Sequence, residues 1–421
     1  MRKTVLVIFS CFLSLLIVPK TYGQEQDKLL GLLKEEFAQQ MKELKGEEFP
    51  PYHMNYRVID VTSSVVSASF GALMNSQQYR SRTLVPQIRL GDEKLDNFRF
   101  SQMGAPMSQY QGPSSARLPL DEVNNEDAVR QAIWNEVNNR YKFAVDMYQK
   151  TKAQSSVNVE EEDKAPYFSE AKVEKYYEAP LPAEKMTIDR DLWAARMKEI
   201  SAVFKNQPGI MKGDAIMIYT VERRYFVNNE GTEVVQNLPY ARIMVFGETK
   251  ADDGMELPLN LSYFAYDPAD LPGNDRIIAD TREMVKTLEA LRVAPVVDPY
   301  TGPALLSGPA SGVFFHEIFG HRIEGQRMKS ESDGQTFKKM IGQLVLPADM
   351  HVYDDPTIRK YAGEDLNGFY KYDDQGVKAE RVDVVVNGKL NDFLMTRTPI
   401  DGHPRTNGHA RASDGFDPVS R

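Results

Sequence analysis

Two histidines and a glutamate stand close together near residue 320, and their types and spacing suit metal-assisted hydrolysis. His316, Glu317 and His321 lie in the run His-Glu-Ile-Phe-Gly-His, so two of the six histidines of the chain belong to one motif. Neutral imidazole nitrogens are good zinc ligands. A carboxylate beside them can take a proton from metal-bound water, whose pKa the metal lowers towards ~7. The motif therefore predicts metal ligands at His316 and His321 and a catalytic group at Glu317.

The two histidines are five residues apart, whereas the common zinc-peptidase motif places them four apart. Five residues at about 100° each turn the second histidine well away from the first on a regular helix. We therefore expect a distorted helix, in which Gly320 either adopts a left-handed conformation or permits a wide turn. On spacing alone, an alternative remains open, in which three polar residues meet by chance at the end of a helix.

A helix before the motif must hold these side chains in place. Pro309 suits the first turn of such a helix, where its missing N–H has no partner to lose. Apolar residues on this segment are expected to bury the helix and to hold the ligands rigidly. They are Val313, Phe314, Phe315, Ile318 and Phe319.

The rest of the chain predicts an α+β fold, because helices flank runs of antiparallel strands without alternating with them strictly. Helical spacing of apolar residues predicts helices over residues 29–44, 125–145, 193–204 and 277–291. Short runs of β-branched and aromatic residues predict strands at 56–60, 64–73, 84–90, 216–223, 225–227, 234–235, 242–246 and 259–266. The turn at residues 228–231, Asn-Asn-Glu-Gly, predicts a hairpin because asparagine and glycine tolerate positive φ.

Several composition changes divide the chain into segments. Arg2 and Lys3 precede an apolar run of residues 5–18, which predicts a signal peptide over residues 1–23 and export to the periplasm or the exterior. An anchoring transmembrane helix is the alternative. A polar stretch at 151–164 predicts a linker. We expect an N-terminal α+β domain at 24–150, a central one at 151–293 and a C-terminal domain at 294–421.

Bulk composition excludes one class of partner. The net charge is -9 and the sequence pI is near 5.4, which argues against binding to a phosphate backbone. The single cysteine, Cys11, lies in the expected signal peptide. A mature chain without cysteine has no disulfides, so its stability must come from packing or from a metal.

The region from about Val296 to Arg411 resembles the TldD/PmbA metallopeptidases. The active members of that family carry His-Glu-x-x-x-His followed closely by Glu-Gly, as His316 to His321 and Glu324-Gly325 do here. Later segments resemble the family's acidic turn and hairpin. They are residues 352–356, the Asp-Asp-Gln-Gly-Val run at 373–377, and 382–396.

The resemblance implies zinc held by His316 and His321, with Glu317 as the general base of a peptidase that cleaves unfolded peptides. It also implies an alternative, a non-catalytic partner subunit of a TldD/PmbA-type heterodimer, and an exported binding module with structural histidines is a third reading. The expected partners are a peptide substrate and a related subunit in a homo- or heterodimer. In the family a cysteine of the C-terminal domain completes the metal site, and further strands follow. We therefore expect a partial C-terminal domain and a third ligand outside these residues. Candidate substitutes within the chain are Glu324, His351, His403 and His409, although each such residue is more often a surface or core polar group than a ligand.

Overall fold

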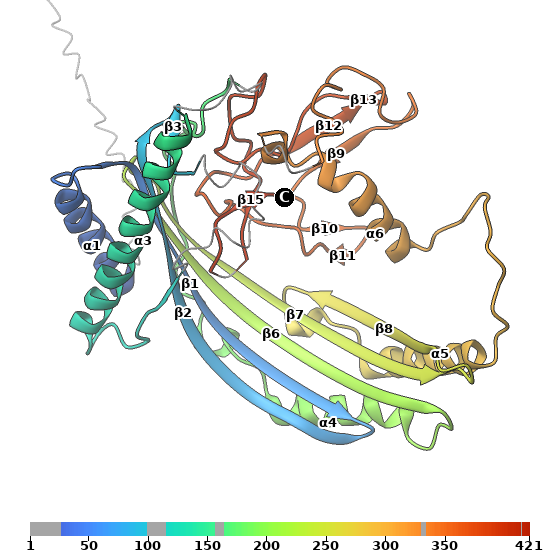
Figure 1. The fold of residues 1–421 in the computed structure, drawn as a ribbon. Helices are drawn as coiled ribbons and strands as arrows, with labels where there is room; N and C mark the ends of the chain where they lie inside the picture. The colour runs from blue at the N-terminus through green and yellow to red at the C-terminus, as the bar shows by residue number, and fades with distance from the viewer. Residues whose placement is uncertain (1–26, 99–114, 156–163, 330–333, 414) are drawn as a thin grey trace, which may run out of the picture.

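Two long β-hairpins form the centre of the molecule (Figure 1). The first pairs β1 (Pro51–Ser69) with β2 (Ala72–Asp92), and the second pairs β6 (Ile210–Asn228) with β7 (Glu233–Lys250). β1 and β6 run antiparallel and join the two hairpins into one curved sheet. β8 (Glu256–Ala265) pairs with β7. This computed structural model describes residues 27–98, 115–155, 164–329, 334–413 and 415–421.

The strands are longer than the sequence pattern predicts. The expected strand at 64–73 is wrong, because it spans the end of β1, a turn and the start of β2. Phe70 and Gly71 make that turn with φ of 45° and 78°. The runs at 216–223 and 225–227 belong to one strand, β6. Some polar side chains that interrupt the apolar pattern are buried, such as Arg57 of β1, which pairs with Asp374 of the C-terminal region.

Helices cover one face of the sheet in two groups. α1 (Lys28–Leu44) and α3 (Glu126–Ser155) pack at one end, and α4 (Arg190–Ser201) and α5 (Asn274–Arg292) pack at the other. The helix N-termini of α1 and α4 are capped by the side chains of the preceding aspartates, which accept backbone N–H groups. Alternate residues of β1 enter two separate apolar cores on this same face. They are Met54, Tyr56 and Val58 in one core, and Val66 and Ala68 in the other.

The fold is multidomain α+β with antiparallel sheets flanked by helices, as predicted. The sheet continues across the expected boundary at residues 150 and 151, since β1 pairs with β6. Both apolar cores also cross it, because Val66 and Ala68 enter one core and Tyr225, Val227 and Val235 enter the other. The first residues of the expected linker belong to α3, and residues 156–163 lie outside the described part of the chain.

The C-terminal region has its own apolar core beneath short strands. β9 (Val352–Asp354) and β13 (Lys389–Leu390) flank β12 (Val382–Val386), and α6 (Gly308–Ile318) precedes them. Other short elements complete the structure. They are β3 (Leu95–Asp96), β4 (Ala116–Arg117), β5 (Lys175–Tyr177), β10 (Lys360–Tyr361), β11 (Glu364–Asp365), β14 (Ala410–Arg411), β15 (Val419–Ser420) and 3-10 turns η2 (Ala183–Lys185), η3 (Ala202–Phe204) and η4 (Pro268–Asp270).

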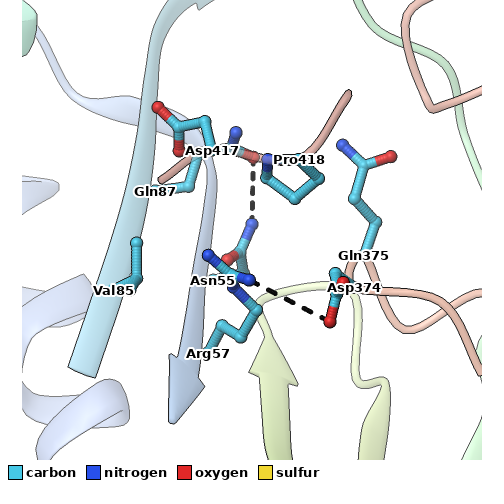
Figure 2. A pocket seen from close by; sticks show the side chains of 8 residues that line it. All are labelled: Asn55, Arg57, Val85, Gln87, Asp374, Gln375, Asp417 and Pro418. Atoms are coloured by element: carbon cyan, nitrogen blue, oxygen red, sulfur yellow. Dashed lines mark hydrogen bonds and ion pairs between the residues drawn. The ribbon is translucent and has the colours of Figure 1, made fainter. Parts of the chain in front are cut away.

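A buried carboxylate joins the C-terminal region to the sheet. Asp374 accepts a hydrogen bond from Arg224 of β6 at 2.9 Å and forms ion pairs with Arg57 of β1 at 4.0 Å and Arg411 at 3.5 Å. Burial alone would raise the pKa of Asp374, but these three arginines lower it below its ordinary value. The cavity beside Asp374 and Arg57 has a volume of about 10 Å³, room for about one water molecule (Figure 2). It is too small to be a substrate site.

The expected signal peptide at residues 1–23 lies outside the described residues. Within the described part of the chain, every helix is too short or too polar to cross a membrane.

Candidate metal centre

The motif lies where one type of helix changes to another. His316 and Glu317 belong to the last turn of α6, and His321 belongs to the 3-10 turn η5 (Gly320–Arg322). Between them, Phe319 leaves the helical conformation with φ of -125° and ψ of -49°. The helix is distorted, as expected, but neither alternative for Gly320 is observed: its φ is not positive, and the break at Phe319 is followed by a tight 3-10 turn instead of a wide one. This change of helix type returns His321 to the side of the helix that carries His316.

The three motif side chains converge. The imidazole rings of His316 and His321 have centroids 4.6 Å apart and are inclined at 70°. Nε2 of His321 is 3.7 Å from Oε2 of Glu317, and Nε2 of His316 is 3.9 Å from Oε1 of the same carboxylate. One ligand atom from each residue lies within 4.8 Å of the other two, and no other group of three such side chains is found among the described residues.

The donor set fits a zinc ion. Imidazole nitrogens are common zinc donors, with metal–nitrogen distances of roughly 2.0–2.1 Å, and a carboxylate beside them can accept a proton from metal-bound water. Nδ1 of His321 is engaged by Glu324 at 2.8 Å, so Nε2 of this ring remains for a metal. His316 and Glu317 are 54% and 62% exposed at their side chains, so both can rotate through small angles to close around an ion.

The four residues considered as substitute ligands lie outside this group of three. Glu324 contacts the far side of the His321 ring, and Arg327 and Arg421 also contact its carboxylate. His403 pairs with Asp392 at 2.8 Å. His409 is fully buried and pairs with Asp354 at 3.1 Å, and His351 accepts a long backbone hydrogen bond from Asn387. None of these four residues belongs to the group formed by His316, Glu317 and His321.

The packing of α6 against the rest of the protein differs from the burial expected from its apolar residues. Val313, Phe314 and Ile318 are exposed, and α6 contains no buried residue. Only Phe319, just after α6, is buried, where it contacts Phe315 and Phe337. The expected burial of α6 by its apolar side chains is therefore wrong. The helix is held mainly from its C-terminal end, because the C-terminal core reaches only that end.

Sequence reasoning treated Glu324 as a substitute ligand and missed its contact with His321. The signal was present in the spacing, because a carboxylate three residues after a histidine lies beside it when the intervening residues form a helical turn. The sequence indicates the acidic turn at 373–377 but not its contacts with β1 and β6.

Comparison with known proteins identifies the C-terminal region. Residues 299–420 match the family model of the PmbA/TldA metallopeptidase C-terminal domain. A protein named metalloprotease from Archaeoglobus fulgidus is 30% identical over 143 residues, which are 32% of each chain. A zinc metalloprotease TldD homolog from Saccharolobus solfataricus is 31% identical over 113 residues, or 26% of this chain and 23% of that one. The matched segments thus span less than half of these relatives.

Solved structures share the fold over most of this chain. TldE from Thermococcus kodakarensis superposes with a TM-score of 0.57 at 14% sequence identity, covering 93% of this chain and 75% of that one. A Thermotoga maritima protein, described as a candidate modulator of a DNA gyrase, gives a TM-score of 0.54 at 13% identity, with 91% and 76% covered. At such identities the likeness concerns the fold alone. The family match and the curated relatives thus place the C-terminal region, residues 299–420, in the TldD/PmbA family of metallopeptidases, and the solved structures show that the chain shares the fold of TldE.

Proposed function

We propose that this protein is a zinc-dependent peptidase in which His316 and His321 bind the metal and Glu317 is the general base. The observation that carries the proposal is the convergence of the three side chains within 4.8 Å. The names of the curated relatives, metalloprotease and zinc metalloprotease, support the same chemistry.

The chain's own groups suit the steps of amide hydrolysis. A bound zinc ion would act as a Lewis acid towards water and the peptide carbonyl. Glu317 is exposed and lies between the two imidazoles, where its carboxylate can accept the proton of an attacking water and return it to the departing amine. His316 and His321 come from the two sides of a break in the helix, which fixes their mutual angle.

The substrate class, partner and location are parts of the same proposal. Extended peptides suit the exposed position of the motif, because an unfolded chain can reach a site that lies on a helix end. The basic and apolar residues at positions 2–18 favour export, which would direct the enzyme to envelope or extracellular peptides. The fold shared with TldE favours assembly with a related subunit. A non-catalytic role within such an assembly is the second candidate, and the intact motif argues against it.

Removal of one imidazole tests the metal site. The full chain, equilibrated with zinc and then desalted, is expected to retain close to one zinc ion, whereas His316→Ala should lose nearly all of it, because one of two imidazole ligands is gone. Elemental analysis measures the zinc, and a fluorogenic peptide assay on the same samples should show cleavage only where zinc remains.

His403→Ala is the matched control, since His403 pairs with Asp392 away from the motif. It should keep both zinc and activity. Zinc retained equally by wild type and His316→Ala would contradict the proposed site. Zinc bound without peptide cleavage by wild type would favour the non-catalytic subunit.

A further inference from the structure

We infer that Glu324 is a positioning residue that holds His321 in the tautomer and orientation needed for metal binding. The inference rests on the proposed metal site and concerns how the chain prepares one of its ligands. Nδ1 of His321 lies 2.8 Å from Oε1 of Glu324, which is a hydrogen-bond distance. The Glu324 side chain is 5% exposed, whereas that of His321 is 29% exposed. A buried carboxylate therefore supports a ring whose other nitrogen is open to the site.

Glu324 is held by backbone pairing on both sides. The backbone N–H of Leu394 donates to the carbonyl of Ile323 at 2.9 Å, and the N–H of Gly325 donates to the carbonyl of Leu394 at 2.9 Å. Glu324 itself forms an isolated β-bridge with Leu394. The Arg327 guanidinium donates to the second carboxylate oxygen of Glu324. The carboxylate thus has a fixed place in the C-terminal core.

Gly325, the residue after Glu324, also contributes to the positioning of the carboxylate. A Cβ added at Gly325 would lie 2.3 Å from Sδ of Met395 and 3.0 Å from the carbonyl oxygen of Leu394. A side chain at this position would displace the Met395 side chain and crowd the carbonyl of Leu394, so glycine suits the close approach of the chain to residues 394–395. The pair Glu324-Gly325 therefore has one joint role, with the glycine allowing the close approach that places the carboxylate.

The shortest contact of Nδ1 of His321, the one with Glu324, indicates which ring nitrogen carries the proton. Arg421 and Arg327 place guanidinium nitrogens 3.0 and 3.4 Å from the same Nδ1, and each guanidinium also contacts Glu324. A carboxylate oxygen and an imidazole lone pair repel at 2.8 Å, so a proton must lie between Nδ1 and Glu324. The lone pair is then on Nε2, the nitrogen that points towards Glu317. Carboxylates that accept from a metal-binding histidine raise its basicity and fix its ring.

The test compares Glu324→Ala and Glu324→Gln with wild type, each as the full chain. Loss of such a carboxylate partner typically weakens metal binding roughly 10- to 100-fold. We expect Glu324→Ala to raise the zinc Kd by about that factor, and Glu324→Gln to raise it less, because its amide oxygen still accepts from Nδ1–H. A competition titration with a zinc chelator measures the Kd. Circular dichroism of the metal-free proteins checks that both variants are folded.

A second readout needs neither metal nor activity. Nitrogen-15 NMR of histidine-labelled protein at alkaline pH reports the tautomer of each ring, and the chain has only six histidines. His321 in wild type should carry its proton on Nδ1, and Glu324→Ala should shift the ring towards the Nε2–H form, while His403 remains unchanged. A wild-type Nε2–H tautomer, with the arginines donating to Nδ1, would overturn the inference. So would an unchanged zinc Kd in Glu324→Ala.

These readouts separate the inference from the proposed function. If wild type binds zinc through a Glu324-dependent site but cleaves no peptide, the peptidase proposal fails and the positioning role stands. If wild type cleaves peptides and Glu324→Ala has the same zinc Kd and the same His321 tautomer, the positioning role fails and the peptidase proposal stands.

Discussion

Replacing Glu317 by glutamine is expected to abolish peptide cleavage while leaving zinc bound. Glutamine has nearly the same shape as glutamate but cannot accept a proton at neutral pH. General acid–base groups contribute roughly 10²- to 10⁴-fold to rates, so kcat should fall by about that factor. Glu317 is the carboxylate between Nε2 of His316 and Nε2 of His321, and no other carboxylate belongs to this group of described residues. Steady-state kinetics and zinc analysis on one preparation measure both effects.

Glu380→Gln is the matched control, since Glu380 is an exposed glutamate of the same C-terminal region. It should leave kcat and zinc content unchanged. Loss of zinc in Glu317→Gln would make Glu317 a ligand instead of a base. Cleavage at the wild-type rate would remove the carboxylate from the mechanism altogether.

Replacing Asp374 by alanine is expected to destabilise the fold by about 3–5 kcal/mol, the usual cost of removing one partner from a buried ion pair. Asp374 and Arg57 have side chains only 2% and 4% exposed. Without the carboxylate, Arg57, Arg224 and Arg411 would face one another across the junction between the sheet and the C-terminal region. The backbone N–H of Ala412 would also lose its acceptor, which lies at 2.9 Å. Urea unfolding of wild type and variant measures the difference.

The same variant should alter the pH dependence of stability. The arginine partners of Asp374 hold its pKa below the ordinary value of 3.8. The contribution of Asp374 to the free energy of unfolding is therefore fully present above pH 3.8. It is lost as the pH falls through the lower pKa of the folded state. The difference in the free energy of unfolding between wild type and Asp374→Ala should therefore be constant near neutral pH and become smaller in strong acid. Its matched control is Asp383→Ala, which breaks an exposed pair with Arg381 and should cost less than about 1 kcal/mol.

Local patterns in the sequence were sufficient for the helices and for one hairpin. Apolar residues at helical spacing correctly placed α1, α3, α4 and α5, because each helix buries one continuous stripe. The turn at 228–231 forms as expected, with the Asn228 side chain accepting the backbone N–H groups of Glu230 and Thr232. These features depend on neighbours within a few residues, which the sequence displays directly.

The sequence by itself also determined which residues could form a metal site, since the side-chain chemistry of His316, Glu317 and His321 does not depend on the backbone conformation. The tertiary structure decided the rest. Strand lengths depended on a second layer that buries Arg57 and contacts the half-buried Arg224, so polar residues continue strands that local propensity would end. The helix break at Phe319 and the place of Glu324 depend on the core around residues 393–395, far along the chain. Contacts between residues so far apart leave no local pattern in the sequence, because these residues come together only when the chain folds.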